Sequence, residues 1–198
     1  DDGRVVATGA QGEPKVIAVD PKRRWIDAVT LAGSGSIAWN TGKTVHARDD
    51  KGKVRSRDFA TTPQGRVFAP KGYRLAIGQM NGVSLWYPNT EAKPDLLDWK
   101  GSHLDVMWSP DGRFVVSSMQ ENALHGWRLG DKPAHMRMTG YPSKPRSLSW
   151  SHDGLWLASS GADAAIVWPF QGEGPSGKAP RECGARHAKV SRVAFHPR

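Results

Sequence analysis

Gly42-Lys43-Thr44 has the residue types that end a phosphate-binding P-loop, in which backbone amides and a lysine hold the phosphates. A P-loop also needs a glycine five residues before Gly42, and that position holds Ile37. No helix is expected to follow and direct its N-terminus at a phosphate. We therefore interpret this stretch as a hairpin turn rather than as a nucleotide site.

Seven histidines could bind a metal ion if several of them shared one site. They are scattered along the chain, and no two of them stand at a spacing typical of metal ligands. They are His46, His103, His125, His135, His152, His187 and His196. The single cysteine, Cys183, could add one thiolate at most. The sequence therefore predicts no metal site and no cofactor.

Residues for covalent or acid–base catalysis are not grouped in the sequence either. A serine nucleophile on a strained turn would need a G-x-S-x-G motif, which the sequence does not contain. Carboxylate pairs such as Asp49-Asp50 lie in expected turns, where an aspartate usually bonds its own backbone. We therefore predict a non-enzymatic protein. The alternative is an enzyme or ligand-binding protein whose site is assembled in a central channel from several repeats.

Lys53, Arg55 and Arg57 alternate with Val54 and Ser56, so a strand here would carry three cations on one face. Such a basic stripe can protect an exposed sheet edge from aggregation, and it can also attract a partner. The net charge of +9 favours acidic partners. A polyanion or nucleic-acid binder is the weaker alternative, because no aromatic residue within the stripe could stack on bases.

Composition limits the class of protein. The chain has 198 residues, 38% of them hydrophobic, and nine tryptophans, which is enough for a folded core. No stretch approaches the run of about 20 apolar residues that crosses a bilayer, so we expect no membrane insertion. One cysteine permits no internal disulfide, which favours a reducing compartment, and we expect a cytoplasmic protein.

The elements that would position these residues repeat along the chain. Turn glycines Gly35, Gly72, Gly112 and Gly154 lie 37, 40 and 42 residues apart, and Pro197 occupies the corresponding place in a fifth turn. A large apolar residue stands four positions before each glycine, with an equivalent before the last turn, and we expect all of these side chains to be buried on inner strands. They are Leu31, Phe68, Trp108, Trp150 and Phe195.

A second series supports the same period. Its members close short apolar runs 38, 41 and 41 residues apart, and they are Arg48, Trp86, Trp127 and Trp168. Four short strands fit each period of about 40 residues, as in the blade of a β-propeller. The expected blades cover residues 25–59, 66–99, 104–139 and 146–184, with partial blades at 4–19 and 190–196. We expect one all-β propeller segment of a larger ring, almost free of helix.

These residues resemble the WD40-repeat β-propeller family, in a degenerate form of bacterial type. Gly101-Ser102-His103 is similar to the family's Gly-His opening, Ser109-Pro110-Asp111-Gly112 to its turn, and Trp127 stands in its Trp position. The residues after Trp86, Trp127 and Trp168 are never Asp. The resemblance implies that His103, Ser117 and Trp127 form a buried hydrogen-bonded set, with Glu121 near the place of the family's turn aspartate.

The resemblance also implies a function and a surface. WD40 propellers are rigid platforms whose variable loops bind other proteins, so we expect a scaffold that acts within a larger assembly. The loops on one rim would supply the contacts. The candidate rim residues are Trp25, Asn81, His103, Glu121, Asn122 and His187.

Overall fold

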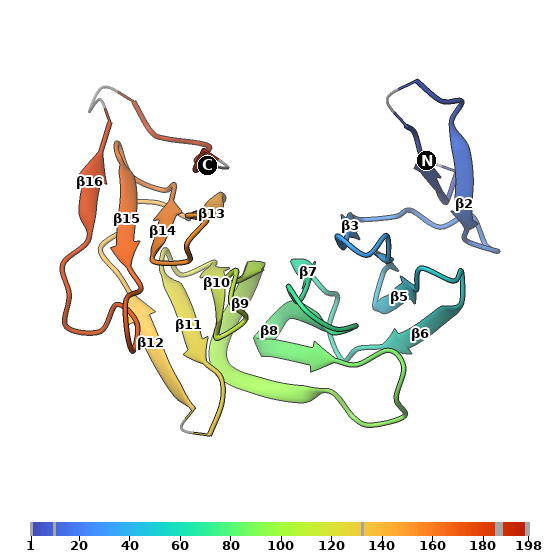
Figure 1. The fold of residues 1–198 in the computed structure, drawn as a ribbon, viewed down its shortest axis with the longest axis horizontal. Coiled ribbons are helices and arrows are strands. Elements are labelled where there is room, and N and C mark those ends of the chain that lie inside the picture. Colours follow the sequence, from blue (N-terminus) through green and yellow to red (C-terminus); the bar gives the residue numbers. More distant parts are fainter. Residues whose placement is uncertain (1, 10, 132, 185–187, 197–198) are drawn as a thin grey trace. The chain divides into compact units, whose positions relative to one another are not determined.

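The computed structural model of the 198-residue chain describes residues 2–9, 11–131, 133–184 and 188–196. Within these ranges the chain forms sixteen β-strands and no helix, which confirms the predicted all-β fold. Accordingly, the described residues contain no helix that could cross a membrane. The structure divides into two compact units (Figure 1). The first comprises residues 1–63 and 88–91, and the second comprises residues 64–87 and 92–198.

The first unit contains a two-stranded and a four-stranded antiparallel sheet. The hairpin consists of β1 (Arg4–Ala7) and β2 (Lys15–Val19). The larger sheet has its strands in sequence order, namely β3 (Val29–Leu31), β4 (Ile37–Thr41), β5 (Thr44–Arg48) and β6 (Val54–Asp58). Val5 packs against Ile37 and Trp39, so the hairpin covers β4.

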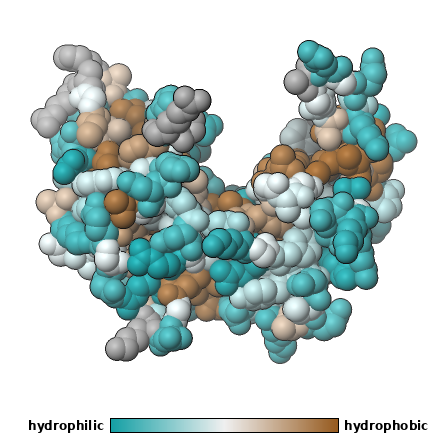
Figure 2. Space-filling model, in the orientation of Figure 1, coloured by the Kyte–Doolittle hydropathy of each residue, from teal (hydrophilic) through white to brown (hydrophobic). Residues whose placement is uncertain are grey.

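Leu31 corrects the prediction that every large residue before a turn glycine is buried. Its side chain is 69% exposed. Leu31 pairs with Ile37 and therefore shares a face with it, but within the first unit the two strands of the hairpin cover β4 and leave β3 bare. Val29 on β3 is exposed as well. Hydrophobic surface accordingly gathers over β2 and β3 in Figure 2.

The second unit begins with a six-stranded sheet in the order β12-β11-β10-β9-β8-β7. Its strands are β7 (Arg66–Phe68), β8 (Leu75–Trp86), β9 (Asp95–Trp108), β10 (Phe114–Met119), β11 (Leu124–Arg128) and β12 (Ala134–Met138). The long β8 contains a sharp turn, where Asn81 and Gly82 have φ values of 63° and 148°. The long β9 joins strands that the sequence assigned to two blades, and it bends at Gly101, where φ is 122°.

A separate four-stranded sheet completes the second unit, with strand order β13-β14-β15-β16. The strands are β13 (Leu148–Trp150), β14 (Trp156–Ser159), β15 (Ala165–Pro169) and β16 (Arg181–Cys183). The described residues from 190 onward form no strand, although the Val193 amide donates to Ser147 Oγ and the Phe195 amide to Ser149 Oγ. Phe195 is half-buried, whereas Phe68, Trp108 and Trp150 are buried as predicted.

The predicted turns repeat at atomic detail in this unit. Ser109 Oγ donates to Asp111 Oδ1 over 2.5 Å, and Ser151 Oγ makes the same bond to Asp153. The glycine that follows each aspartate has a positive φ, 76° at Gly112 and 69° at the equivalent residue. These turns connect the inner two strands of successive four-strand repeats, which supports the periodicity inferred from the sequence.

Candidate partner-binding sites

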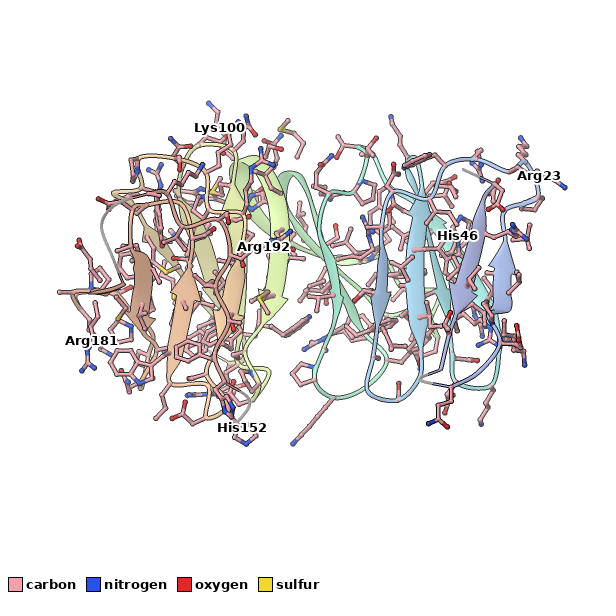
Figure 3. The ribbon with its side chains drawn as sticks, turned by 90° about the horizontal axis from the view of Figure 1, so that it is seen from above. Arg23, His46, Lys100, His152, Arg181 and Arg192 are labelled. Atoms are coloured by element: carbon pink, nitrogen blue, oxygen red, sulfur yellow. The ribbon has the colours of Figure 1, made fainter. Side chains whose placement is uncertain are left out.

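The strands of the second unit run between two opposite sets of loops. Lys100 marks one end and His152 the other in Figure 3. The turn inside β8, the bend of β9 and the β10–β11 turn lie together at the Lys100 end, because neighbouring strands bring them there. We call this end the rim.

Two predicted rim residues are held at this end by the backbone of β9. The Gly101 amide donates to Asn81 Oδ1, and the Ser102 amide donates to Glu121 Oε1, both over 3.3 Å. Gly101 has a φ of 122°, a backbone conformation that residues with a Cβ rarely adopt, so glycine is favoured at this bend. Met80, beside Asn81, exposes about half of its side chain.

Asn122 follows Glu121 in the same turn with a φ of 53° and is half-buried. The rim of the second unit therefore presents the side chains of Met80, Asn81 and Glu121 on a fixed backbone.

Trp25, another predicted rim residue, belongs to the first unit, where it is 63% exposed. His187 lies outside the described residues.

His103 corrects the predicted rim, because its side chain is completely buried. Its Nδ1 lies 2.6 Å from Ser117 Oγ, and its Nε2 lies 3.0 Å from the carbonyl oxygen of Trp99. Burial lowers the pKa of His103, so the neutral ring donates from Nε2 to the carbonyl and accepts at Nδ1 from the serine. His103 is a structural residue and cannot contact a partner. Glu121 does not join this set.

Sequence reasoning missed an equivalent set in the next sheet. Tyr141 takes the place of the histidine, with its hydroxyl accepting from Trp168 Nε1 over 2.6 Å and lying 2.5 Å from Ser159 Oγ. Burial raises the pKa of Tyr141 to about 12. The available signal was Trp168 in the repeating Trp position, which requires an acceptor for its indole N–H when buried.

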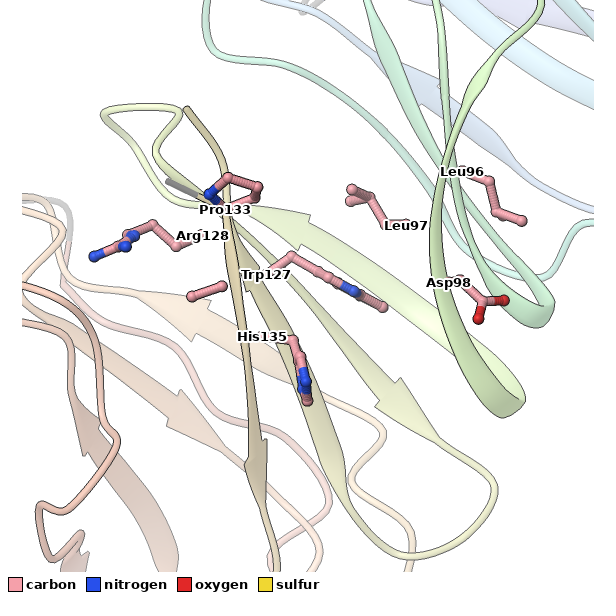
Figure 4. Close-up of a pocket in the computed structure, with 8 residues that line it drawn as sticks. Leu96, Leu97, Asp98, Trp127, Arg128, Pro133 and His135 are labelled. Atoms are coloured by element: carbon pink, nitrogen blue, oxygen red, sulfur yellow. The ribbon is translucent and has the colours of Figure 1, made fainter. Parts of the chain in front are cut away.

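A pocket of about 240 Å³ lies between the first part of β9 and the strands β11 and β12. Leu97 and Trp127 reach into it from opposite walls, with Pro133 and His135 at either side (Figure 4). Arg128 lies at its border and points away, toward an ion pair with Glu173. We call this the outer pocket.

Three aromatic rings pack together behind the outer pocket. Trp99 stacks on His125 with ring centroids 4.0 Å apart, and His125 stacks on His135 at 5.4 Å. The ring centroid of Trp99 also lies 5.1 Å from that of His135, so the three rings form one cluster, which we call the aromatic ladder. His125 is fully buried, and neither of its ring nitrogens has a hydrogen-bond partner in the described part of the chain. Burial, helped by His135 and His103, lowers the pKa of His125 to about 3.

These histidines do not form a metal site. Across the ranges that the structure describes, no group of three or more His, Cys, Asp or Glu side chains could hold a metal ion. Aromatic stacking accounts for the closeness of His125 and His135 instead.

Arg55 and Arg57 of the basic stripe lie on β6, the terminal strand of its sheet, and Lys53 directly precedes that strand. Arg55 pairs with Ala47 and Arg57 with Val45, so both arginines share a face with fully buried apolar residues and are themselves half-buried. Lys53 is exposed, and its amide donates to Asp49 Oδ1. The predicted alternation is present, and the arginine stems also cover apolar surface.

Residues 134–168 match the family model of the WD domain, G-beta repeat. A chromatin assembly factor 1 subunit FAS2 homolog from Oryza sativa subsp. japonica is 26% identical over 104 residues, which are 48% of this chain and 21% of that protein. Protein HIR1 from Chaetomium globosum is 26% identical over 132 residues, covering 50% of this chain and 12% of that protein.

Meiotic recombination protein rec14 from Schizosaccharomyces pombe is 29% identical over 101 residues, covering 50% of this chain and 33% of that protein. The chain thus spans a third or less of each of these relatives. A chain in the crystal structure of the mitotic checkpoint complex has the same fold, with a TM-score of 0.79 over 96% of this chain and 62% of that one, at 15% identity. The chain is therefore similar to WD40-repeat proteins in sequence over residues 134–168 and in fold over 96% of its length.

Proposed function

We propose that the chain is a non-enzymatic scaffold that binds a protein partner within a larger assembly. The main support is the rim, where β9 fixes exposed Met80 and Asn81 beside Glu121 on a rigid sheet. Preformed loops on a rigid scaffold bind at low entropic cost, because little ordering is needed on association. One of the relatives is named as a subunit of chromatin assembly factor 1 and another as a meiotic recombination protein.

An acidic partner is the finer part of this proposal. The chain carries a net charge of +9, and opposite charge on the partner would raise the rate of encounter more than the final affinity. We expect the protein to lie in the compartment of its partner. The sequence predicts the cytoplasm, and the names of the relatives suggest the nucleus as the alternative. Fluorescence microscopy of the tagged full-length protein separates the two.

The experiment is affinity purification of the full-length protein, with variants of the rim. Met80→Glu should reduce recovery of the partner, because it places a negative charge in the proposed contact. Glu121→Lys should also reduce recovery, because it removes the carboxylate that accepts from the Ser102 amide and holds the rim in place. Leu155→Glu is the matched control, since Leu155 is also an exposed apolar residue but lies beside the turn at the His152 end. Equal recovery with all three variants would contradict binding through the rim.

A further inference from the structure

The outer pocket is shaped to hold one side chain from another protein. Its walls come from Leu97, Trp127, Pro133 and His135, and the histidine next to it, His125, is kept neutral by burial. A volume of about 240 Å³ exceeds the roughly 150 Å³ apolar cavity that holds a benzene molecule. The pocket therefore accommodates a leucine, methionine or phenylalanine side chain, whose apolar surface it would remove from water.

The pocket opens beside an unpaired sheet edge. β12 pairs with β11 from Ala134 to Met138, and its other edge pairs with no strand among the described residues. Such an edge can accept an extended segment of a partner, with backbone hydrogen bonds giving affinity and pockets for alternate side chains giving specificity. Met136 and Met138 are buried on the opposite face, so the strand is firmly seated.

The positive charge of Arg137 on β12 favours an acidic residue at a second position of the bound segment. Arg137 lies two residues beyond His135, so the two side chains share the face that carries the pocket. Arg137 is exposed, and it takes part in no ion pair of the described chain. A residue two positions from the apolar anchor of an added strand would lie opposite Arg137, where a carboxylate is favoured.

We propose that the outer pocket and the β12 edge bind an extended segment of a protein partner, with an apolar anchor in the pocket and an acidic residue two positions away. This inference rests on the proposed scaffold function and gives it a second contact surface, separate from the rim. The ligand is thus a short acidic peptide in which the apolar anchor and the acidic residue stand two positions apart.

The first unit contains a second pocket with which the outer pocket can be compared. A pocket between β2 and the strands β5 and β6 is lined by Trp39, His46, Val54 and Ser56 among others. There His46 is bonded to Ser56 Oγ over 2.7 Å, and the residue two positions beyond Ser56 is Asp58. An acidic ligand residue would be repelled at that place, so we expect only the pocket of the second unit to select it.

The test uses synthetic heptapeptides of threonine and valine that contain Leu-x-Glu or Glu-x-Leu, so that either strand direction is covered. Titration into the isotope-labelled chain, followed by amide chemical shifts, should perturb Ala134–Met138. Replacing the peptide leucine by serine should weaken binding by about tenfold or more, as expected for one buried leucine side chain. Replacing the glutamate by lysine should also weaken binding.

Variants of the chain locate the contact. Leu97→Asp should abolish binding, whereas Leu155→Asp, a remote exposed leucine, should leave it unchanged. Arg137→Glu changes an exposed residue, so the fold is retained, and it should invert the preference from the glutamate peptide to the lysine peptide.

Several results would overturn the inference: no binding by either glutamate peptide, shifts confined to other strands, or no change of preference in Arg137→Glu. Met80→Glu tells the two proposals apart, because it disrupts the rim and should leave peptide binding intact. If the peptide binds but the rim variants do not change recovery of the partner, the proposal that the rim binds the partner is refuted and the proposal for the outer pocket stands.

Discussion

His125→Phe tests whether the aromatic ladder holds a neutral histidine at a cost that depends on pH. The unfolded chain should bind a proton at His125 with a pKa of about 6.5. In the folded chain, burial lowers that pKa to about 3. Below about pH 6.5 the unfolded state therefore binds more protons than the folded state, and the free energy of unfolding falls as the pH decreases toward 3.

The size of this loss follows from the two pKa values. Between pH 7 and pH 5, linkage gives at most about 2 kcal/mol for one histidine with this difference. Solvent reaches the neighbouring His135 at the pocket mouth and screens part of the effect, so we expect about 1 kcal/mol. Phenylalanine cannot titrate and can still stack on Trp99, so the variant should lose correspondingly less stability over this range.

Urea denaturation at pH 7 and pH 5, followed by tryptophan fluorescence, measures the free energy of unfolding of both proteins. His46 and His103 also have lowered pKa values, but both remain in the variant, so the difference between the proteins isolates His125. The reasoning is refuted if that difference is the same at both pH values. At pH 7 the variant should be at least as stable, because it removes two buried nitrogens without partners.

Three further perturbations have expected outcomes. Tyr141→Phe leaves the buried Trp168 indole N–H without its acceptor and should cost about 1–3 kcal/mol in urea denaturation, and an unchanged midpoint would contradict the bond. Gly101→Ala places a Cβ on a residue with a φ of 122°, which strains the backbone, so the melting temperature should fall, and an unchanged value would disprove the tight bend. Reversing Arg55 and Arg57 to Glu should slow association with an acidic partner at low salt; equal binding would leave the basic stripe as edge protection only.

The repeat pattern predicted the strands and turns because each depends on local chemistry. Ser109-Pro110-Asp111-Gly112 specifies a turn through its own side-chain bond and the positive φ of its glycine. Burial of Leu31 could not be predicted in the same way, because it depends on how many strands cover β3. His103 stood in two predictions, as a rim residue and as a member of a buried set with Ser117, and its burial and its bond to Ser117 agree with the second.

The outer pocket was beyond sequence reasoning because its walls come from strands about 30 residues apart. Leu97 belongs to the predicted 66–99 blade, whereas Trp127 and His135 belong to the 104–139 blade. Their closeness depends on β9, which runs without interruption from one repeat into the next. The alternation of inward and outward side chains along β12 could be recognised in the sequence. Which of its two faces lines a pocket could not be recognised.

The same aromatic ladder that lowers the pKa of His125 also prepares the outer pocket for a ligand. Trp99, His125 and His135 pack against one another, and the bond from His103 to the Trp99 carbonyl fixes the strand that carries Trp99. Side chains held in this way lose little freedom when a ligand binds, so most of the apolar contact contributes to affinity. Loosening the ladder should therefore weaken the heptapeptide even where no pocket residue is changed. Ser117→Ala, which removes the partner of His103 Nδ1 within the sheet, should reduce peptide affinity severalfold while leaving the preference for glutamate intact, and unchanged affinity in a folded variant would show that the pocket does not depend on the ladder.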